Sequence, residues 1–383
     1  MGIKLSSGGG TGPSTPFSQP KHNYGADAPP DALTPFQKVL KWCRWIMVGL
    51  TVLYVVAIAV IIWAIEYDAE DHHLSSVMMY MPQYIWLLPL AILTPLCLFL
   101  RPILVVVHVA VAAVVLIFFM DYVWAGPQEA TGPTFKIMTN NVGENHGKSI
   151  QPFVEANNPD IIVLQDAGRR GPEYQKMFPE AYLRGHDQFL LVSKYPILNG
   201  GVLDMADAEG RPVAAWFEVD LNGQGIYVFA LHMPTPRAQL NAVKGFGLLA
   251  SVAHRVKQGG HADKVYLEGK EFFRNQYELA EKMINFTKEA DKPFVVCGDF
   301  NIPTHGKTYH LYKQNWIEAF AVSGKGYGCT FPGDANITKI FGPWLRLDNI
   351  YCSEALKPIN TMAERDRPSQ HRSMIATLQL PKR

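Results

Sequence analysis

Three long apolar stretches dominate the first third of the chain. Residues 45–65 form a run of 21 residues without a charged side chain, and a helix of that length crosses about 30 Å of hydrocarbon at 1.5 Å per residue. Residues 75–100 are also uncharged, and a third apolar run covers residues 102–120. Only Arg101 separates the second run from the third, so we expect a tight helical hairpin there. The pattern predicts a membrane anchor of three transmembrane helices over residues 37–124.

The charges around these stretches are distributed asymmetrically. Basic residues precede the first stretch or separate the second from the third: Lys38, Lys41, Arg44 and Arg101. The loop between the first two stretches has no Lys or Arg and carries Glu66, Asp68, Glu70 and Asp71. By the positive-inside rule, the N-terminus is cytoplasmic, and three crossings place the chain after Trp124 outside the cytoplasm. The sequence therefore predicts an integral membrane protein of the plasma or inner membrane with an extracytoplasmic domain.

Two segments flank the predicted anchor. Residues 1–36 are rich in Gly, Ser, Pro and Thr and show almost no apolar periodicity, which is typical of a disordered tail. Residues 125–133 contain two Gly and two Pro and are predicted to be a linker.

Short runs of strand length follow the linker. These runs cover residues 135–139, 161–165, 189–193, 214–221, 226–232, 294–297, 348–352 and 373–380. Helical patterns lie between several of them, notably over residues 149–157 and 272–290. Strands mixed with helices in about 250 residues predict an α/β sandwich with the helices outside, over residues 134–383.

The net charge argues against a nuclease, and the cysteine content argues against a disulfide-rich fold. The formal net charge is +1 for the chain, and residues 134–383 hold 29 Lys and Arg against 26 Asp and Glu, a net charge of +3. A nuclease that binds many phosphates is expected to be more basic. The five cysteines do not form a disulfide framework, although Cys329 and Cys352 could pair in an oxidising compartment.

Polar residues recur where the predicted strands begin or end. In chain order the motifs are TNNV at 139–142, LQD at 164–166, LHMP at 231–234, GDFN at 298–301, RLDNIY at 346–351 and SQH at 369–371. Side chains two apart on an extended segment point the same way, so Asp299 and Asn301 can face one target. Such a carboxylate can take a proton from water while the amide orients the water or a phosphate oxygen. A turn at an ordinary strand end is the alternative explanation for this motif.

Taken together, these ordered motifs resemble the endonuclease/exonuclease/phosphatase family, which includes deoxyribonuclease I, apurinic endonucleases, sphingomyelinases and inositol-phosphate phosphatases. The resemblance covers residues 134–381. It implies an α/β fold, a four-layer α-β-β-α sandwich of two mixed sheets. It also implies hydrolysis of phosphate esters with a divalent metal, usually Mg²⁺, with Mn²⁺ as an alternative.

The resemblance assigns roles to single residues. Asn141 and Asp166 match metal-shell positions, with Gln370 as a further position in that shell. The family usually has Glu in place of Asp166 and Asp in place of Gln370. The shorter carboxylate and the lost charge predict weaker metal binding or an altered metal, and a catalytically inactive binding module is the alternative.

The remaining residues match catalytic positions of the family. Asp299 matches the residue that activates water, and Asn301 matches the residue that holds the same phosphate region. His371, backed by Asp348, and His232 match residues that contact the phosphoryl oxygens.

Two further features lie near these motifs. Arg169 and Arg170 closely follow Asp166 and could clamp a second phosphate, or form a solvated pair on a loop. Residues 235–270 resemble an insertion with apolar residues at near-helical spacing, which predicts either an interfacial helix beside the active site or a helix packed on the domain.

Three membrane spans before an outward-facing domain of this family resemble the architecture of VanJ-type teicoplanin-resistance membrane proteins. This architecture implies that the membrane lipid bilayer is a partner and that the substrate lies at its surface. The substrate would be a lipid-linked phosphate or diphosphate, or a phospholipid head group. A nuclease of the cell envelope that cuts DNA or RNA is the first alternative, and the inactive binding module is the second.

Overall fold

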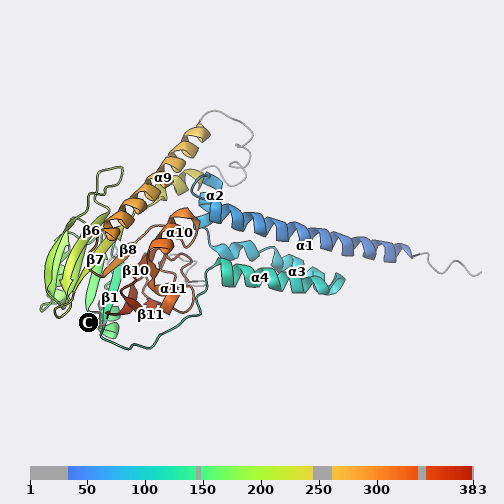
Figure 1. The fold of residues 1–383 in the computed structure, drawn as a ribbon. Coiled ribbons are helices and arrows are strands. Elements are labelled where there is room, and N and C mark those ends of the chain that lie inside the picture. The colour runs from blue at the N-terminus through green and yellow to red at the C-terminus, as the bar shows by residue number, and fades with distance from the viewer. Residues whose placement is uncertain (1–32, 144–147, 245–260, 335–341, 382–383) are drawn as a thin grey trace, which may run out of the picture.

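Figure 1 shows a two-sheet domain from which a stalk of helices projects. In this computed structural model, the described residues are 33–143, 148–244, 261–334 and 342–381. Most of the predicted tail, residues 1–32, lies outside the described residues, as do residues 245–260 of the predicted insertion.

Three stretches of helix, here called the stalk helices, form the stalk. The first is α1 (Pro35–Tyr67), the second combines η1 (Gln83–Leu87) with α3 (Leu90–Leu100), and the third combines α4 (Ile103–Ala113) with η2 (Val114–Phe119). His108 of α4 joins all three, because its two ring nitrogens lie 3.1 Å from the hydroxyls of Thr51 on α1 and Thr94 on α3.

Two of the three predicted transmembrane helices have the length and composition of a membrane span. Pro35–Tyr67, with 33 residues, and Gln83–Leu100, with 18, are long and apolar enough to cross a membrane, whereas Ile103–Phe119 is shorter. The second predicted span also starts later than expected. Its first residues form the separate helix α2 (His73–Tyr80), which ends before Met81-Pro82 because proline disfavours a helical conformation in the residue before it.

The domain contains two mixed six-stranded sheets. The first has the strand order β11-β12-β1-β2-β4-β3 and the second β5-β6-β7-β8-β10-β9. The strands of the first sheet are β1 (Thr134–Asn141), β2 (Ile161–Gln165), β3 (Tyr182–His186), β4 (Phe189–Ser193), β11 (Lys357–Ala363) and β12 (Met374–Gln379). Those of the second are β5 (Ile197–Val202), β6 (Ala214–Asp220), β7 (Gly225–His232), β8 (Phe294–Asp299), β9 (Ile317–Glu318) and β10 (Asp348–Cys352).

Helices flank both sheets. The helices of the domain are α5 (Gln151–Asn157), α6 (Gly171–Met177), α7 (Arg237–Lys244), α9 (His261–Lys288), α10 (Gly306–Asn315) and α11 (Ala319–Ser323). A central core that includes Ile137, Phe217 and Val295 lies between the sheets. Val154 and Tyr174 pack α5 and α6 on the outer face of the first sheet, while α9 and α10 cover the second. The predicted sandwich of two mixed sheets with outer helices is therefore found.

Three local predictions can be compared with the structure. The helix expected at residues 272–290 begins earlier, at His261, whereas the helix expected within the insertion at 235–270 is found in part, as α7 (Arg237–Lys244). Cys329 and Cys352 are both free cysteines, so the suggested disulfide is absent.

Arg346 ties the stalk to the domain. Its buried guanidinium pairs with Asp121, just after η2, and lies 3.1 Å from the carboxylate of Glu318. It also donates to the backbone carbonyl of Tyr327 at 2.7 Å. Burial alone would lower the pKa of Arg346, but the two carboxylates raise it well above its ordinary value. The guanidinium thus stays charged in the interior, where both carboxylates depend on it.

Arg346→Met is expected to lower the free energy of unfolding of the full chain by about 3–5 kcal/mol, because Glu318 and Asp121 lose their shared cation. Arg274→Met is the matched control. Arg274 pairs with Glu278 on the exposed face of α9, and its loss should change stability by about 0–1 kcal/mol. Denaturant titration of both variants measures the difference, and equal losses would contradict the assigned role of Arg346.

Candidate active site

The register of the second sheet brings three predicted site residues side by side. Asp299 ends β8, where its register partner on the parallel strand β7 is His232. Its partner on the antiparallel strand β10 is Asp348. The first sheet contributes the end of β1 and the loop before β12, which carry Asn141 and His371. The site therefore lies at one end of the sandwich and is shared by both sheets.

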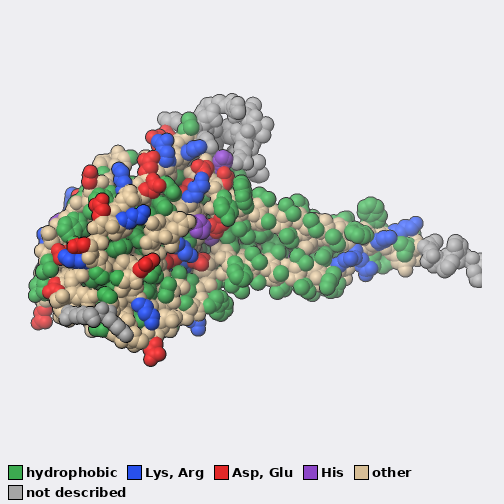
Figure 2. Space-filling model, in the orientation of Figure 1, with side chains coloured by type: hydrophobic (Ala, Val, Ile, Leu, Met, Phe, Trp, Pro, Cys, Tyr) green, Lys and Arg blue, Asp and Glu red, His purple; other side chains and the backbone are tan. Residues whose placement is uncertain are grey.

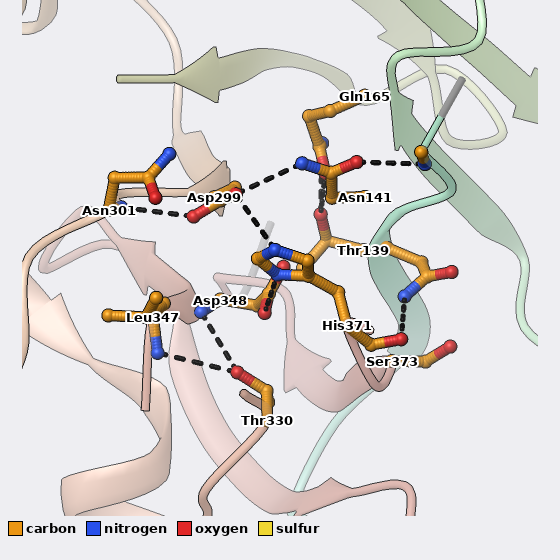
Figure 3. A network of polar contacts seen from close by, with 12 residues as sticks. Thr139, Asn141, Gln165, Asp299, Asn301, Thr330, Leu347, Asp348, His371 and Ser373 are labelled. Atoms are coloured by element: carbon orange, nitrogen blue, oxygen red, sulfur yellow. Dashed lines mark hydrogen bonds and ion pairs between the residues drawn. The ribbon is translucent and has the colours of Figure 1, made fainter. Parts of the chain in front are cut away.

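Asp299 is the centre of this arrangement (Figure 3). Its side chain is 1% exposed, and its carboxylate accepts hydrogen bonds from the Asn141 amide and the Asn301 backbone N–H, each at 3.0 Å. The Nε2 atoms of His371 and His232 lie 3.6 and 3.7 Å from its Oδ2. Burial raises the pKa of Asp299, and the two histidines oppose that rise. A carboxylate with a raised pKa is a better proton acceptor near neutral pH.

His371 lies between two carboxylates. Its Nδ1 is 2.9 Å from Asp348 Oδ2, and the Figure 3 view shows the ring between Asp348 and Asp299. Burial disfavours the imidazolium, but Asp348 and Asp299 outweigh this effect and raise the pKa of His371 to about 9. The backbone N–H of Asp348 donates to the Thr330 hydroxyl at 3.2 Å, which holds the carboxylate's strand end in place. His371 is therefore a cation at neutral pH, with Nε2 turned toward Asp299.

His232 is oriented by a residue that sequence reasoning missed. Its Nδ1 lies 2.6 Å from Gln188 Oε1 and 3.6 Å from Asp166 Oδ1. Gln188 comes from the turn between β3 and β4, and β3 was itself not predicted. With Nδ1 donating to the glutamine oxygen, Nε2 faces Asn141 and Asp299.

A cavity of about 910 Å³ opens over these groups. Its polar lining includes Asn141, Asp166, His232, Asp299, Asn301, Gln370 and His371. Its apolar lining includes Val77 and Met81 from the segment between the first two stalk helices, together with Phe331, Trp344 and Leu345 of the domain. The predicted site residues and the segment between the first two stalk helices therefore share one cavity.

The three residues predicted for the metal shell all line the cavity, and each carries a side-chain oxygen of the kind that binds a divalent cation. Asp166 is half-buried with a left-handed backbone, φ +55°, and Gln370 and Asn141 line the same cavity. Asn141 Oδ1 accepts from the backbone N–H of Gly143 at 3.0 Å and keeps a second lone pair. Mg²⁺ prefers a small number of oxygen ligands from the protein, and water molecules complete its coordination shell.

A second group of candidate ligands is buried. Ligand atoms of Asp299, Asp348 and His371 lie within 4.8 Å of one another. A histidine ligand must be neutral, whereas His371 is held protonated by its two carboxylates. A metal bound by this group would therefore have to displace the His371 proton.

Arg169 and Arg170 are not among the residues that line the cavity. Arg169 is exposed, and Arg170 pairs with Glu173 at 3.0 Å on α6. Arg211 and Arg237, which sequence reasoning did not single out, line the cavity instead. Of these two, Arg211 is largely exposed and pairs with Asp207 at 3.0 Å.

Comparison with known proteins agrees with this fold and motif order. The profile of the Endonuclease/Exonuclease/phosphatase family matches residues 138–371. A search of curated proteins gave no match.

Several solved structures align with the domain. A family protein from Bacteroides thetaiotaomicron is 14% identical, covering 66% of this chain and 100% of its own, with a TM-score of 0.45. A mannosyl-6-phosphatase from the same organism is 16% identical over 64% and 99%, with a TM-score of 0.43. The human Nocturnin catalytic domain is 15% identical over 65% and 95%, with a TM-score of 0.42. Because the family profile spans more than half of the sequence, this chain belongs to the endonuclease/exonuclease/phosphatase family, whose members are phosphoric ester hydrolases.

Proposed function

We propose that this chain is a membrane-anchored, divalent-metal-dependent phosphoesterase that acts outside the cytoplasm on a lipid-linked phosphate or diphosphate or a phospholipid head group. The observation that carries the proposal is the shared cavity, which is lined by the proposed catalytic side chains and by the apolar residues Val77 and Met81 from the segment between the first two stalk helices. A phosphate ester with an apolar chain matches both kinds of lining.

The surface of the stalk supports the membrane part of the proposal. Large apolar side chains such as Leu53, Phe99 and Val106 are exposed there, and Figure 2 shows them covering the stalk. Such a surface is stable in contact with lipid and unfavourable in water. Basic side chains gather at the far end of the stalk in the same view, which fits a cytoplasmic N-terminus and an extracytoplasmic domain.

The proposed reaction begins with proton transfer to Asp299. Its carboxylate accepts a proton from water as the water oxygen attacks phosphorus, while Asn301 holds the same phosphate region. The bond from phosphorus to the leaving oxygen breaks, and that oxygen leaves with the electron pair. The His371 imidazolium donates to a non-bridging oxygen, and His232 donates to another through Nε2 when both of its ring nitrogens are protonated. These donors stabilise the negative charge of the non-bridging oxygens.

Enzymes of this family are typically dependent on a divalent metal. In this chain Asp166, Asn141 and Gln370 would hold Mg²⁺ or Mn²⁺, which when bound neutralises phosphoryl charge as a Lewis acid. Gln370 lacks the negative charge that the family usually places there, so the three residues supply one carboxylate only.

Asp299→Asn is expected to lower kcat by about 10²–10⁴-fold, because it removes the proton acceptor and keeps the side-chain shape. Phosphate release by the full chain in nanodiscs should be measured with Mg²⁺ and Mn²⁺ on phosphatidate, polyprenyl phosphates and diphosphates, phospholipids, plasmid DNA and RNA. Asp291→Asn, exposed before the start of β8, is the control. Faster hydrolysis of DNA or RNA than of the lipids would favour the nuclease over the lipid hydrolase. Absence of both turnover and metal binding would favour the inactive binding module.

Val77→Asn is expected to raise KM for a long-chain phosphatidate about tenfold, because a polar group replaces part of the apolar wall. KM for glycerol phosphate, which has no chain, should stay unchanged. Val322→Asn, on the exposed surface of α11, serves as the control. An equal change in KM for both substrates would argue against an acyl-chain site at Val77.

Asp166→Asn is expected to weaken Mn²⁺ binding about tenfold or more, because it removes the one carboxylate of the proposed metal site. Gln370→Asp should instead tighten binding by restoring a charge. Calorimetric titration of the full chain measures both changes without relying on turnover, and Asp160→Asn, at the other end of β2, is the control. Unchanged affinity in the first two variants would place the metal elsewhere.

A further inference from the structure

Tyr80 links the stalk directly to a proposed catalytic residue. It is the last residue of α2, and its hydroxyl donates to the backbone carbonyl of Asn301 at 2.8 Å. The backbone carbonyl of Tyr80 accepts a hydrogen bond from the Trp344 indole at 3.1 Å. Two separate loops of the domain therefore hold this one residue, which also lines the cavity.

Asn301 depends on such contacts because its backbone is left-handed, with φ +49°. Its N–H donates to Asp299 at 3.0 Å, and its side-chain amide donates to the carbonyl of Met233 at 2.8 Å. The residue is 6% exposed. Without Tyr80 its carbonyl would lose its donor in a largely buried position, which is costly and favours a different backbone conformation.

The position of α2 is fixed independently of Tyr80. Glu70, just before α2, accepts hydrogen bonds from the backbone N–H and the hydroxyl of Thr308 at 2.9 and 3.0 Å. Gln83, just after it, donates to the carbonyls of Met78 and Met79. Because the helix is held at both ends, the Tyr80 hydroxyl reaches Asn301 from a defined place.

We propose that Tyr80 is a positioning residue for the active site: by holding the Asn301 carbonyl, it fixes the turn from Asp299 to Asn301. The segment between the first two stalk helices thereby completes the catalytic geometry of the domain. The expected change in kcat rests on the proposed function. The effect of Tyr80 on the turn from Asp299 to Asn301 can be measured without it.

The chain offers a matched control for this role. The Tyr327 hydroxyl also joins the domain to the stalk, donating to the backbone carbonyl of Leu116 at 3.1 Å, but Tyr327 does not line the catalytic cavity. Tyr80→Phe and Tyr327→Phe each remove one hydroxyl and one hydrogen bond between stalk and domain. Only the first bond reaches a proposed catalytic residue.

Both variants should be compared with the full-length wild-type chain in nanodiscs. Tyr80→Phe is expected to lower kcat on the best phosphate ester about tenfold with little change in KM, because small displacements of a catalytic group have large effects on rate. Tyr327→Phe should leave both constants unchanged. Hydrogen exchange of the peptide containing residues 300–304 should become faster in Tyr80→Phe alone.

The two readouts separate the inference from the proposed function. Faster exchange in Tyr80→Phe without hydrolysis of any ester by the wild type would support the positioning role and reject the proposed reaction. Hydrolysis by the wild type with unchanged exchange and kcat in Tyr80→Phe would overturn the positioning role alone. Equal effects of the two variants would also overturn it, since Tyr80 would then act only as a tether.

Discussion

The burial of the Asp299 carboxylate is the constraint on which the site depends. A carboxylate removed from water is costly unless donors or cations surround it, and no single strand can supply them all. Here the neighbouring strand β7 places His232 beside it, while the first sheet supplies Asn141 and the loop before β12 supplies His371. Both sheets must therefore be packed together before all of these groups surround the carboxylate.

The balance of charge around His371 follows from that constraint. Two buried carboxylates would repel each other strongly, and a protonated imidazole between them relieves the repulsion. The result is a preorganised cation beside a proton acceptor, which is the pairing that phosphate ester hydrolysis needs. In this chain Gln370 replaces a residue that is usually acidic, so Asp166 alone gives the proposed metal site a formal charge.

Much of the fold could be predicted because its central strands are continuous apolar runs. The strands β2, β4 and β10 have the predicted bounds. The strands β3, β5 and β11 were missed because their apolar signal is weak: β3 and β5 have no fully buried residue, and β11 is buried only in part. The proposed catalytic residues were found from motif order, and sheet register explains why they meet. The sequence around Gln188 and Tyr80 does not indicate their roles. Gln188 contacts His232, 44 residues further along the chain, and Tyr80 contacts Asn301, 221 residues further along.

The uncharged stretch at residues 75–100 shows how composition can hide function. The absence of charge suggested one long span, yet Pro82 divides the stretch, and its first part becomes α2 beside the catalytic cavity. Tethering alone would raise the effective concentration of any substrate in the bilayer. In the proposed function, the wall formed by Val77 and Met81 would add discrimination, because it would give the apolar part of a substrate a surface to bind while the phosphate reaches Asp299. The stalk would then determine where the enzyme acts, and the segment between its first two helices would determine which esters the enzyme can hold.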